Sequence, residues 1–110
     1  MDVKEIRVVN EWRDVLEQSR EQPVFVLKHS ATCPISASAY REFKAFETDL
    51  EKNYLIVQDS RSVSNEIEDD LGIQHQSPQL FLLKDGKAIW QATHYEINKG
   101  KIKNAVEDFC

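Results

Sequence analysis

Cysteine is scarce in this 110-residue chain, which has only two, Cys33 and Cys110. Small secreted domains that depend on disulfides carry many more. No apolar run approaches the ~20 residues that a membrane-spanning helix needs, and the first residues lack the apolar segment of a signal peptide. We therefore expect a cytoplasmic protein with neither a disulfide framework nor a membrane partner.

Positive charge is also in short supply. Fourteen lysines and arginines stand against nineteen aspartates and glutamates, and the formal net charge is -5 at pH 7. No basic cluster offsets this excess, so we expect no nucleic-acid partner. The cysteines and histidines match no standard zinc spacing, so no metal is expected either. The length, without repeats or linkers, predicts a single domain over residues 1–110.

Short apolar runs predict the strands of the protein. They lie at residues 24–28, 54–57, 79–83 and 88–92, and a looser alternation over residues 3–9 predicts an edge strand. Between the last two runs, Asp85-Gly86 suits the positive φ angles of a type I′ hairpin turn.

Segments with helical spacing separate these strands. The first helix is expected to begin at an N-cap Asn10, and the second to run from Pro34 with an apolar stripe as far as Leu50. The third ends at Gly72, a C-cap, and the last begins near Asn98. The resulting order predicts an α/β fold, with a mixed central sheet of four to five strands flanked by helices on both faces.

Cys33 lies where the strand at residues 24–28 gives way to a helix. Pro34 suits the first helical position, which places Cys33 at or next to the N-cap. The unpaired N–H groups and the positive end of the helix dipole then favour the thiolate, which is the nucleophilic form of cysteine. The alternative interpretation of Cys33 is a small buried apolar residue at a helix start.

The element order, with a cysteine at a strand-to-helix turn and a proline before the hairpin, resembles the thioredoxin fold over essentially the whole chain. The motif Thr32-Cys33-Pro34-Ile35-Ser36 is similar to the TCPIS motif of the monothiol bacilliredoxins of the YtxJ type. Residues 28–30, 37–43 and 77–79 resemble that family as well.

This resemblance implies an enzyme, a thiol–disulfide oxidoreductase that removes bacillithiol from S-bacillithiolated proteins. Cys33 would be the catalytic nucleophile, bacillithiol the thiol co-substrate, and S-bacillithiolated client proteins the partners. Thioredoxins use two cysteines three residues apart, and Ser36 takes the second position here. Because a hydroxyl cannot break a mixed disulfide, a second thiol must close the cycle.

Five further residues are expected to bind the substrate or stabilise the thiolate beside Cys33, and one of them is Pro34 at the helix start. The resemblance implies a cis Ser77–Pro78 bond, with the backbone of Ser77 presented to the bound thiol or peptide; the alternative is a trans proline that ends the loop. Thr32 either orients the substrate or is the helix N-cap or the residue before it. Ser36 either hydrogen-bonds the sulfur or fills the first helical turn.

The histidines and an acidic run are open to plainer interpretations. His29 and His75 would either stabilise the thiolate as imidazolium groups or be ordinary surface histidines. His94 has no evident role. The acidic run at residues 66–70 predicts a solvated helix face.

Cys110 is expected ~15–18 Å from the active-site end, because the last helix runs away from it over about 12 residues at 1.5 Å each. A disulfide needs Cα atoms within roughly 7 Å, so we expect that Cys110 does not resolve the Cys33 mixed disulfide within one chain. We expect a monomer, with a Cys110-linked dimer as the alternative. The competing functions are a monothiol glutaredoxin-like iron–sulfur scaffold and a thiol-binding adaptor. Pro34 argues against the scaffold, because proline lacks the backbone donor beside a cluster sulfur.

Overall fold

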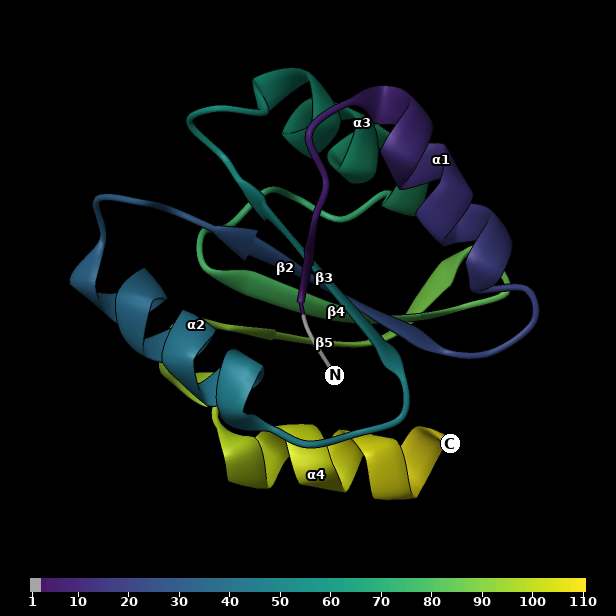
Figure 1. Cartoon of the computed structure of the whole chain (residues 1–110), viewed down its shortest axis with the longest axis vertical. Coiled ribbons are helices and arrows are strands. Elements are labelled where there is room, and N and C mark those ends of the chain that lie inside the picture. Colours follow the sequence, from purple (N-terminus) through teal and green to yellow (C-terminus); the bar gives the residue numbers. More distant parts are fainter. Residues whose placement is uncertain (1–2) are drawn as a thin grey trace.

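A five-stranded sheet organises this computed structural model, which describes residues 3–110. Helices separate the first four strands along the chain, and the last two strands follow each other directly (Figure 1). The elements are β1 (Lys4–Glu5), α1 (Val9–Gln18), β2 (Val24–His29), α2 (Pro34–Ala45), β3 (Glu51–Ile56), α3 (Arg61–Leu71), β4 (Gln79–Lys84), β5 (Lys87–Thr93), the short 3-10 helix η1 (His94–Glu96) and α4 (Lys99–Phe109).

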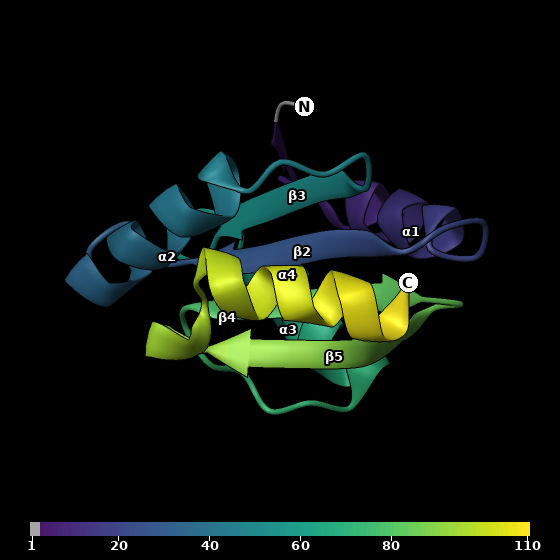
Figure 2. The ribbon, with the colours of Figure 1, turned by 90° about the horizontal axis from the view of Figure 1, so that it is seen from below.

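The central strand of the sheet is β2, in the order β1-β3-β2-β4-β5. β1 and β2 both pair with β3 in parallel, whereas β4 is antiparallel to both β2 and β5. Helices α1 and α3 lie on one face of the sheet and α2 and α4 on the other (Figure 1). Seen from below, α4 crosses in front of the strands beside β5 (Figure 2). The α/β class and the mixed sheet covered on both faces are confirmed.

Side chains of β2 alternate between two apolar cores. Val24 and Val26 belong to the core that α1 and α3 cover, and Phe25 and Leu27 to the core that α2 and α4 cover. All four side chains are fully buried. Burial stabilises by roughly 25 cal/mol per Å² of apolar surface, so the strand that leads into Cys33 is held from both faces.

The first helix begins earlier than the sequence predicts. Its N-cap is Val8 rather than Asn10. The carboxylate of Glu11 accepts hydrogen bonds from the backbone N–H groups of Arg7 and Val8, at 2.8 and 3.2 Å. A side chain inside the helix thus satisfies the donors that precede it, and no Asn cap is needed. Of the predicted edge strand over residues 3–9, only β1 pairs with the sheet.

A buried lysine explains two further differences. The ammonium of Lys52 donates to the carbonyls of Phe43 and Lys44, at 3.1 Å each, and to that of Phe46. These bonds satisfy the last carbonyls of α2, which ends at Ala45, short of the predicted Leu50. β3 begins at Glu51, before the predicted residues 54–57. Its first residues are polar in sequence although Lys52 is buried, so the apolar pattern did not reveal them.

Three predicted turns and helix boundaries are confirmed. Gly72 ends α3 in the left-handed region, at φ 67°. Asp85 and Gly86 both have positive φ, 54° and 74°, as a type I′ turn requires. The side chain of Asn98 caps α4 by accepting the N–H of Lys101 at 3.0 Å. Within residues 3–110 the structure contains no helix long and apolar enough to cross a membrane.

Substituting Lys52→Met should lower the free energy of unfolding by about 1–3 kcal/mol, because the carbonyls at the end of α2 lose their buried donor. Urea denaturation followed by far-UV circular dichroism measures this change. Lys103→Met, at an exposed position of α4, is the matched control and should leave the midpoint unchanged. Equal midpoints for the two variants would show that Lys52 does not cap α2.

Candidate active site

Cys33 is the N-cap of α2. Its backbone is extended, at φ -103° and ψ 122°, and Pro34 occupies the first helical turn. The N–H of Ala37 donates to the carbonyl of Cys33 at 3.0 Å, which closes that turn. The thiol is half-buried and free of any disulfide. The interpretation of Cys33 as a fully buried apolar residue is therefore wrong, and its sulfur lies at the positive end of a 12-residue helix.

Ser36 holds the strand-to-helix turn together from inside the helix. Its hydroxyl accepts the backbone N–H of Ser30 at 2.8 Å and lies 2.9 Å from Nδ1 of His29. The side chain is fully buried. The structure thus gives Ser36 a place in the first turn, where its hydroxyl bonds the preceding loop.

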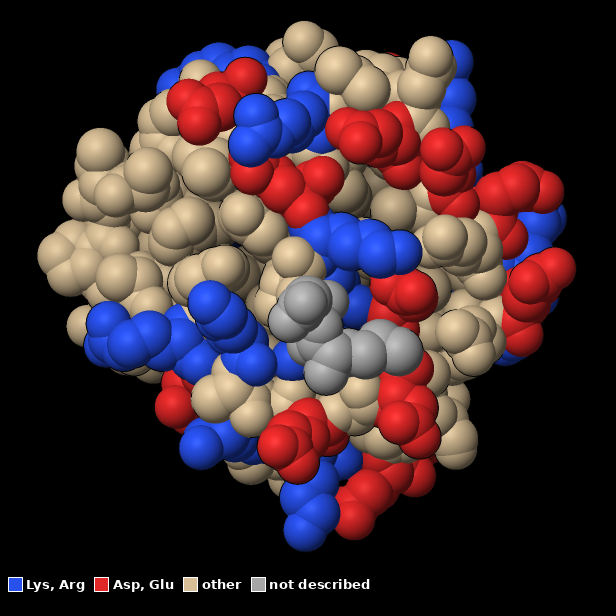
Figure 3. Space-filling view, viewed as in Figure 1, with Lys and Arg blue, Asp and Glu red and all other residues tan. Residues whose placement is uncertain are grey.

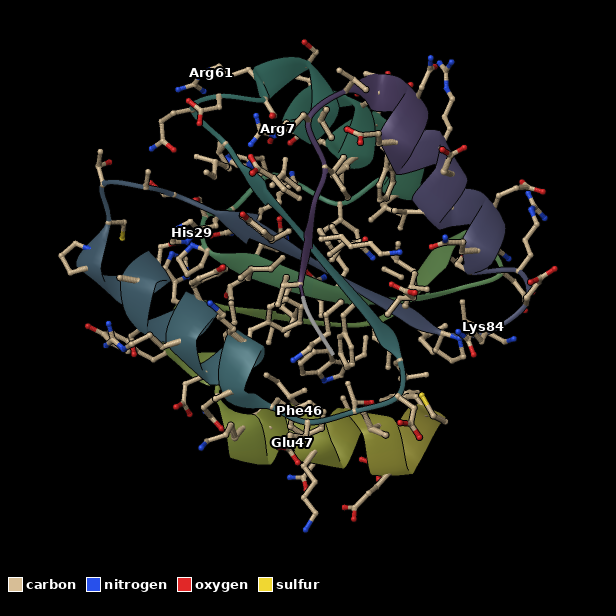
Figure 4. The ribbon with its side chains drawn as sticks, viewed as in Figure 1. Arg7, His29, Phe46, Glu47, Arg61 and Lys84 are labelled. Carbon is tan, nitrogen blue, oxygen red and sulfur yellow. The ribbon has the colours of Figure 1, made fainter. Side chains whose placement is uncertain are left out.

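His29 is part of this turn and not a surface histidine. Its ring packs on Tyr40, with centroids 5.0 Å apart, and Figure 4 shows it beside the start of α2. Burial lowers the pKa of His29 below its usual value of 6.5, and the hydrogen bond with Ser36 opposes that shift. The ring is therefore neutral at neutral pH, and an imidazolium that would stabilise the thiolate is not available from His29.

Gln58 is a site residue that sequence reasoning missed. Its side-chain oxygen accepts the N–H of Ala31 at 3.1 Å, and its amide nitrogen donates to the hydroxyls of Ser30 at 2.8 Å and Thr32 at 3.4 Å. One side chain thus holds the whole loop that precedes Cys33. A signal existed, because Gln58 follows a strand parallel to β2, and parallel strands end at the same edge of a sheet.

The exposed residues of the motif flank the sulfur. Thr32 and Pro34 are both exposed, on either side of the half-buried Cys33. Thr32 directly precedes the cap, and its hydroxyl contacts Gln58, as described above. The surface over the start of α2 carries no charged side chains in Figure 3, while acidic and basic groups mix over much of the remaining face.

The Ser77–Pro78 bond is cis, as the resemblance implies. Pro78 is buried directly before β4, and Gln79 pairs with Lys28 near the end of β2, so this bond lies at the same edge of the sheet as Cys33. The hydroxyl of Ser77 is buried and has no hydrogen-bond partner in the part of the chain that the structure describes.

His94 contacts this proline through its backbone, although the sequence suggested no role for it. The N–H of His94 donates to the carbonyl of Pro78 at 3.1 Å. His94 itself has φ 53°, in the left-handed region that a residue other than glycine seldom adopts. Such backbone geometry persists where the surrounding structure fixes it, and often at functional sites.

His75 and the acidic run at residues 66–70 also differ from expectation. His75 is half-buried and lies 3.1 Å from the buried ammonium of Lys28. Glu68 accepts the backbone N–H of His75 at 2.7 Å, and Asp70 accepts the indole N–H of Trp12 at 2.8 Å. Two of the acidic residues therefore bind other elements, and the run is not simply a solvated face.

The two thiols lie at opposite ends of the sheet. Cys110 follows the last turn of α4, and Lys84, at the far end of β4, is the charged group that influences its pKa. Burial raises the pKa of the Cys110 thiol above its usual value, and Lys84 opposes this shift. Figure 4 shows Lys84 and His29 on opposite sides of the molecule. Among residues 3–110, no group of three or more His, Cys, Asp or Glu side chains is placed to hold a metal ion.

Gln58→Met keeps the length of the side chain but removes its hydrogen bonds to the loop. We expect the Ala31 amide to exchange with deuterium about 3- to 10-fold faster, because one net hydrogen bond is worth about 0.5–1.5 kcal/mol. Hydrogen exchange read by mass spectrometry measures this rate. Asp59→Asn, at the neighbouring exposed position, should leave it unchanged; an unaltered rate in Gln58→Met would remove Gln58 from the site.

Stability should also fall as the pH drops below 6.5. Burial lowers the pKa of His29 in the folded chain, so the unfolded chain binds a proton over a pH range in which the folded chain does not. His29→Asn can accept the Ser36 hydroxyl but cannot titrate, so its unfolding free energy should lose less between pH 7 and pH 5 than that of the wild type. Urea titrations at both pH values measure the difference, and equal losses would contradict it.

Comparisons with known proteins agree with this geometry. The chain matches the model of the family described as monothiol bacilliredoxin BrxC over residues 4–102. A solved oxidoreductase with a thioredoxin fold is 38% identical, with a TM-score of 0.87 over 94% of this chain and 93% of its own.

Thioredoxins share the fold at much lower identity. Those of Schistosoma mansoni and Fasciola hepatica are 14% and 11% identical, with TM-scores of 0.80 and 0.78. They cover 99% and 97% of this chain, and 96% and 99% of their own. Since the family model spans most of the chain, including the cysteine motif and the cis-proline loop, the protein has a thioredoxin-like fold and belongs to the monothiol bacilliredoxin family.

Proposed function

We propose that this thiol oxidoreductase removes bacillithiol from S-bacillithiolated proteins. One observation carries the proposal: a half-exposed cysteine caps α2, and the position of a second redox cysteine is filled by a serine bonded to the loop. Such a site is able to attack a mixed disulfide but has no neighbouring thiol with which to close a ring.

The reaction consists of two thiol–disulfide exchanges. In the first, the Cys33 thiolate attacks the bacillithiol sulfur of the client's mixed disulfide; the new S–S bond joins Cys33 to bacillithiol, and the client leaves as a thiolate that takes up a proton. In the second, the thiolate of another bacillithiol attacks this adduct. Cys33 is released as a thiolate, and oxidised bacillithiol is formed. The electron that the client sulfur gains therefore comes from the second bacillithiol, whose thiol is oxidised as the new disulfide forms.

The surroundings of Cys33 support this chemistry. The positive end of α2 stabilises negative charge on the sulfur before attack and after release. Ser77, next to the cis bond, is the residue whose backbone N–H and C=O we assign to the bound thiol or client backbone. The uncharged surface at the start of α2 imposes no charge requirement on a client chain (Figure 3).

The same chemistry suggests where the protein acts and in what oligomeric state. A monothiol exchange enzyme needs a pool of small thiol, so we place it in the reducing cytoplasm and expect a monomer that meets its clients in solution. A dimer linked through Cys110 stays a prediction, which the exposed position of that residue allows.

Mass spectrometry of the intact protein tests the proposal. Reduced protein mixed with a peptide disulfide-bonded to bacillithiol should gain one bacillithiol and release the free peptide thiol. Cys33→Ala should lose this adduct and Cys110→Ala should keep it. An adduct on Cys33→Ala would overturn the site assignment.

Two controls separate the competing explanations. The same peptide carrying glutathione tests whether another small thiol is preferred; equal rates for both would remove the specificity for bacillithiol. A visible absorbance band in protein purified without oxygen would instead indicate an iron–sulfur scaffold.

A further inference from the structure

Lys28 is a fully buried lysine at the end of the central strand. It follows Leu27 in β2 and its ammonium reaches toward α3, where Nζ lies 3.1 Å from Nδ1 of His75. An ammonium only donates hydrogen bonds, so this ring nitrogen accepts and carries no proton. A buried charge persists only where partners hold it, which makes this contact costly to lose.

His75 connects this lysine to α3. The hydroxyl of Ser64 lies 3.3 Å from the same Nδ1, and the backbone N–H of His75 donates to Glu68 at 2.7 Å. The side chain and the backbone of one loop residue are thus both bound by buried or half-buried groups.

A second clamp holds the same loop from β4. Gln79, which is buried and pairs with Lys28 in the sheet, accepts the N–H of Gln76 at 3.1 Å. It also donates to the carbonyl of Gln74 at 3.3 Å. The loop over residues 73–77 is therefore tied on both sides of His75, immediately before the Ser77–Pro78 bond.

We propose that Lys28, His75 and Glu68 are positioning residues that hold the loop over residues 73–77, so that Ser77 presents its backbone to the incoming disulfide. None of the three contacts the reacting sulfur in this scheme; they act through the loop. The inference rests on the function proposed above, in which Ser77 lines the substrate.

Because Lys28 and His75 titrate, we expect the positioning of this loop to depend on pH. Burial lowers the pKa of Lys28 to about 8, although Glu68 opposes the shift. Burial also lowers the pKa of His75, Lys28 and Arg61 lower it further, and Glu68 raises it. Arg61, at the start of α3, is the remaining charged group that acts on His75. The sheet neighbours of Lys28 are Leu55 and Gln79, and both are uncharged.

The hydrogen bonds of the cluster are strongest while Lys28 is charged and His75 is neutral. Above about pH 8 the lysine loses its charge, and the bond to His75 loses its charge assistance. Below the lowered pKa of His75, Nδ1 gains a proton and no longer accepts from Lys28 or Ser64. Positioning of Ser77 should therefore be best between these limits.

A ratio of two rates isolates this effect. Cys110→Ala protein, in which only Cys33 reacts, is treated with iodoacetamide and, separately, with an uncharged peptide joined to 2-thiopyridine through a disulfide. Cys33 displaces pyridine-2-thione from that peptide, which is followed by absorbance. Both rates depend on the thiolate form of Cys33, so this dependence cancels in the ratio of the peptide rate to the iodoacetamide rate. The ratio therefore reports how well Ser77 binds the peptide backbone.

We expect this ratio to follow a bell-shaped pH profile and to fall about 3- to 10-fold above pH 8, the effect of one hydrogen bond. Glu68→Gln is the decisive variant, because the new amide oxygen still accepts the His75 N–H while the charge is gone. Since Glu68 raises the pKa values of both Lys28 and His75, both limbs should move to lower pH. A purely structural role for Glu68 would not move them.

A second variant tests the lysine itself. Lys28→Met should lower the ratio at pH 7 about 3- to 10-fold and abolish the alkaline limb, whereas the exposed Lys103→Met should match the parent protein. If Lys28→Met does not fold, Glu68→Gln decides alone. A flat profile in the parent, or unmoved limbs in Glu68→Gln, would overturn the inference.

The proposed function is tested separately with the same peptide carrying bacillithiol. Failure of the parent protein to take bacillithiol, with a bell-shaped ratio for the thiopyridine peptide, would overturn the function and leave the positioning role intact. If the parent protein takes bacillithiol but its rate ratio does not change with pH, the proposed function stands and the positioning role is overturned.

Discussion

The hydrogen bond from the Ser30 backbone to the hydroxyl of Ser36 sets the geometry of the whole site. It spans 2.8 Å between the loop after β2 and the first turn of α2. Because the Ser36 side chain is fully buried, loss of this bond would leave a polar group without water. The bond therefore fixes where the helix begins, and with it the cap position that Cys33 occupies.

This constraint also explains why one thiol suffices. In a dithiol site the residue three positions after the first cysteine must move its sulfur toward that cysteine to close a disulfide. Here that position is committed to Ser30 and His29, so it supports the turn and takes no part in exchange. Gln58, which follows β3, holds the same loop from the neighbouring strand. A rigid loop beside a single free sulfur suits exchange with a small thiol that supplies its own resolving partner.

Local patterns in the sequence were enough to predict most of the fold. The apolar run of β2, the left-handed Gly72, the Asp85-Gly86 turn and the Asn98 cap are each determined by neighbouring residues. The start of α1 was missed, because Glu11 caps it from within the helix.

The supporting residues of the site depend on contacts between distant segments and could not be predicted in the same way. Lys28 meets a histidine 47 positions away, and the amide of Gln58 meets Ser30, 28 positions away. The periodicity of the sequence carries no information about such pairs. The burial of Lys52 could not be predicted for another reason. A lysine in a strand is normally expected to be exposed, but here its buried ammonium donates to the carbonyls at the end of α2.

If the turn at the start of α2 makes Cys33 the reactive thiol of the chain, Cys33 should react before Cys110. A competition between the two cysteines tests it most directly: reduced wild-type protein is treated with less than one equivalent of iodoacetamide at pH 7, and the label on each cysteine is counted by peptide mass spectrometry. We expect Cys33 to take most of the label although Cys110 is the more exposed residue. Equal labelling, or preference for Cys110, would contradict it.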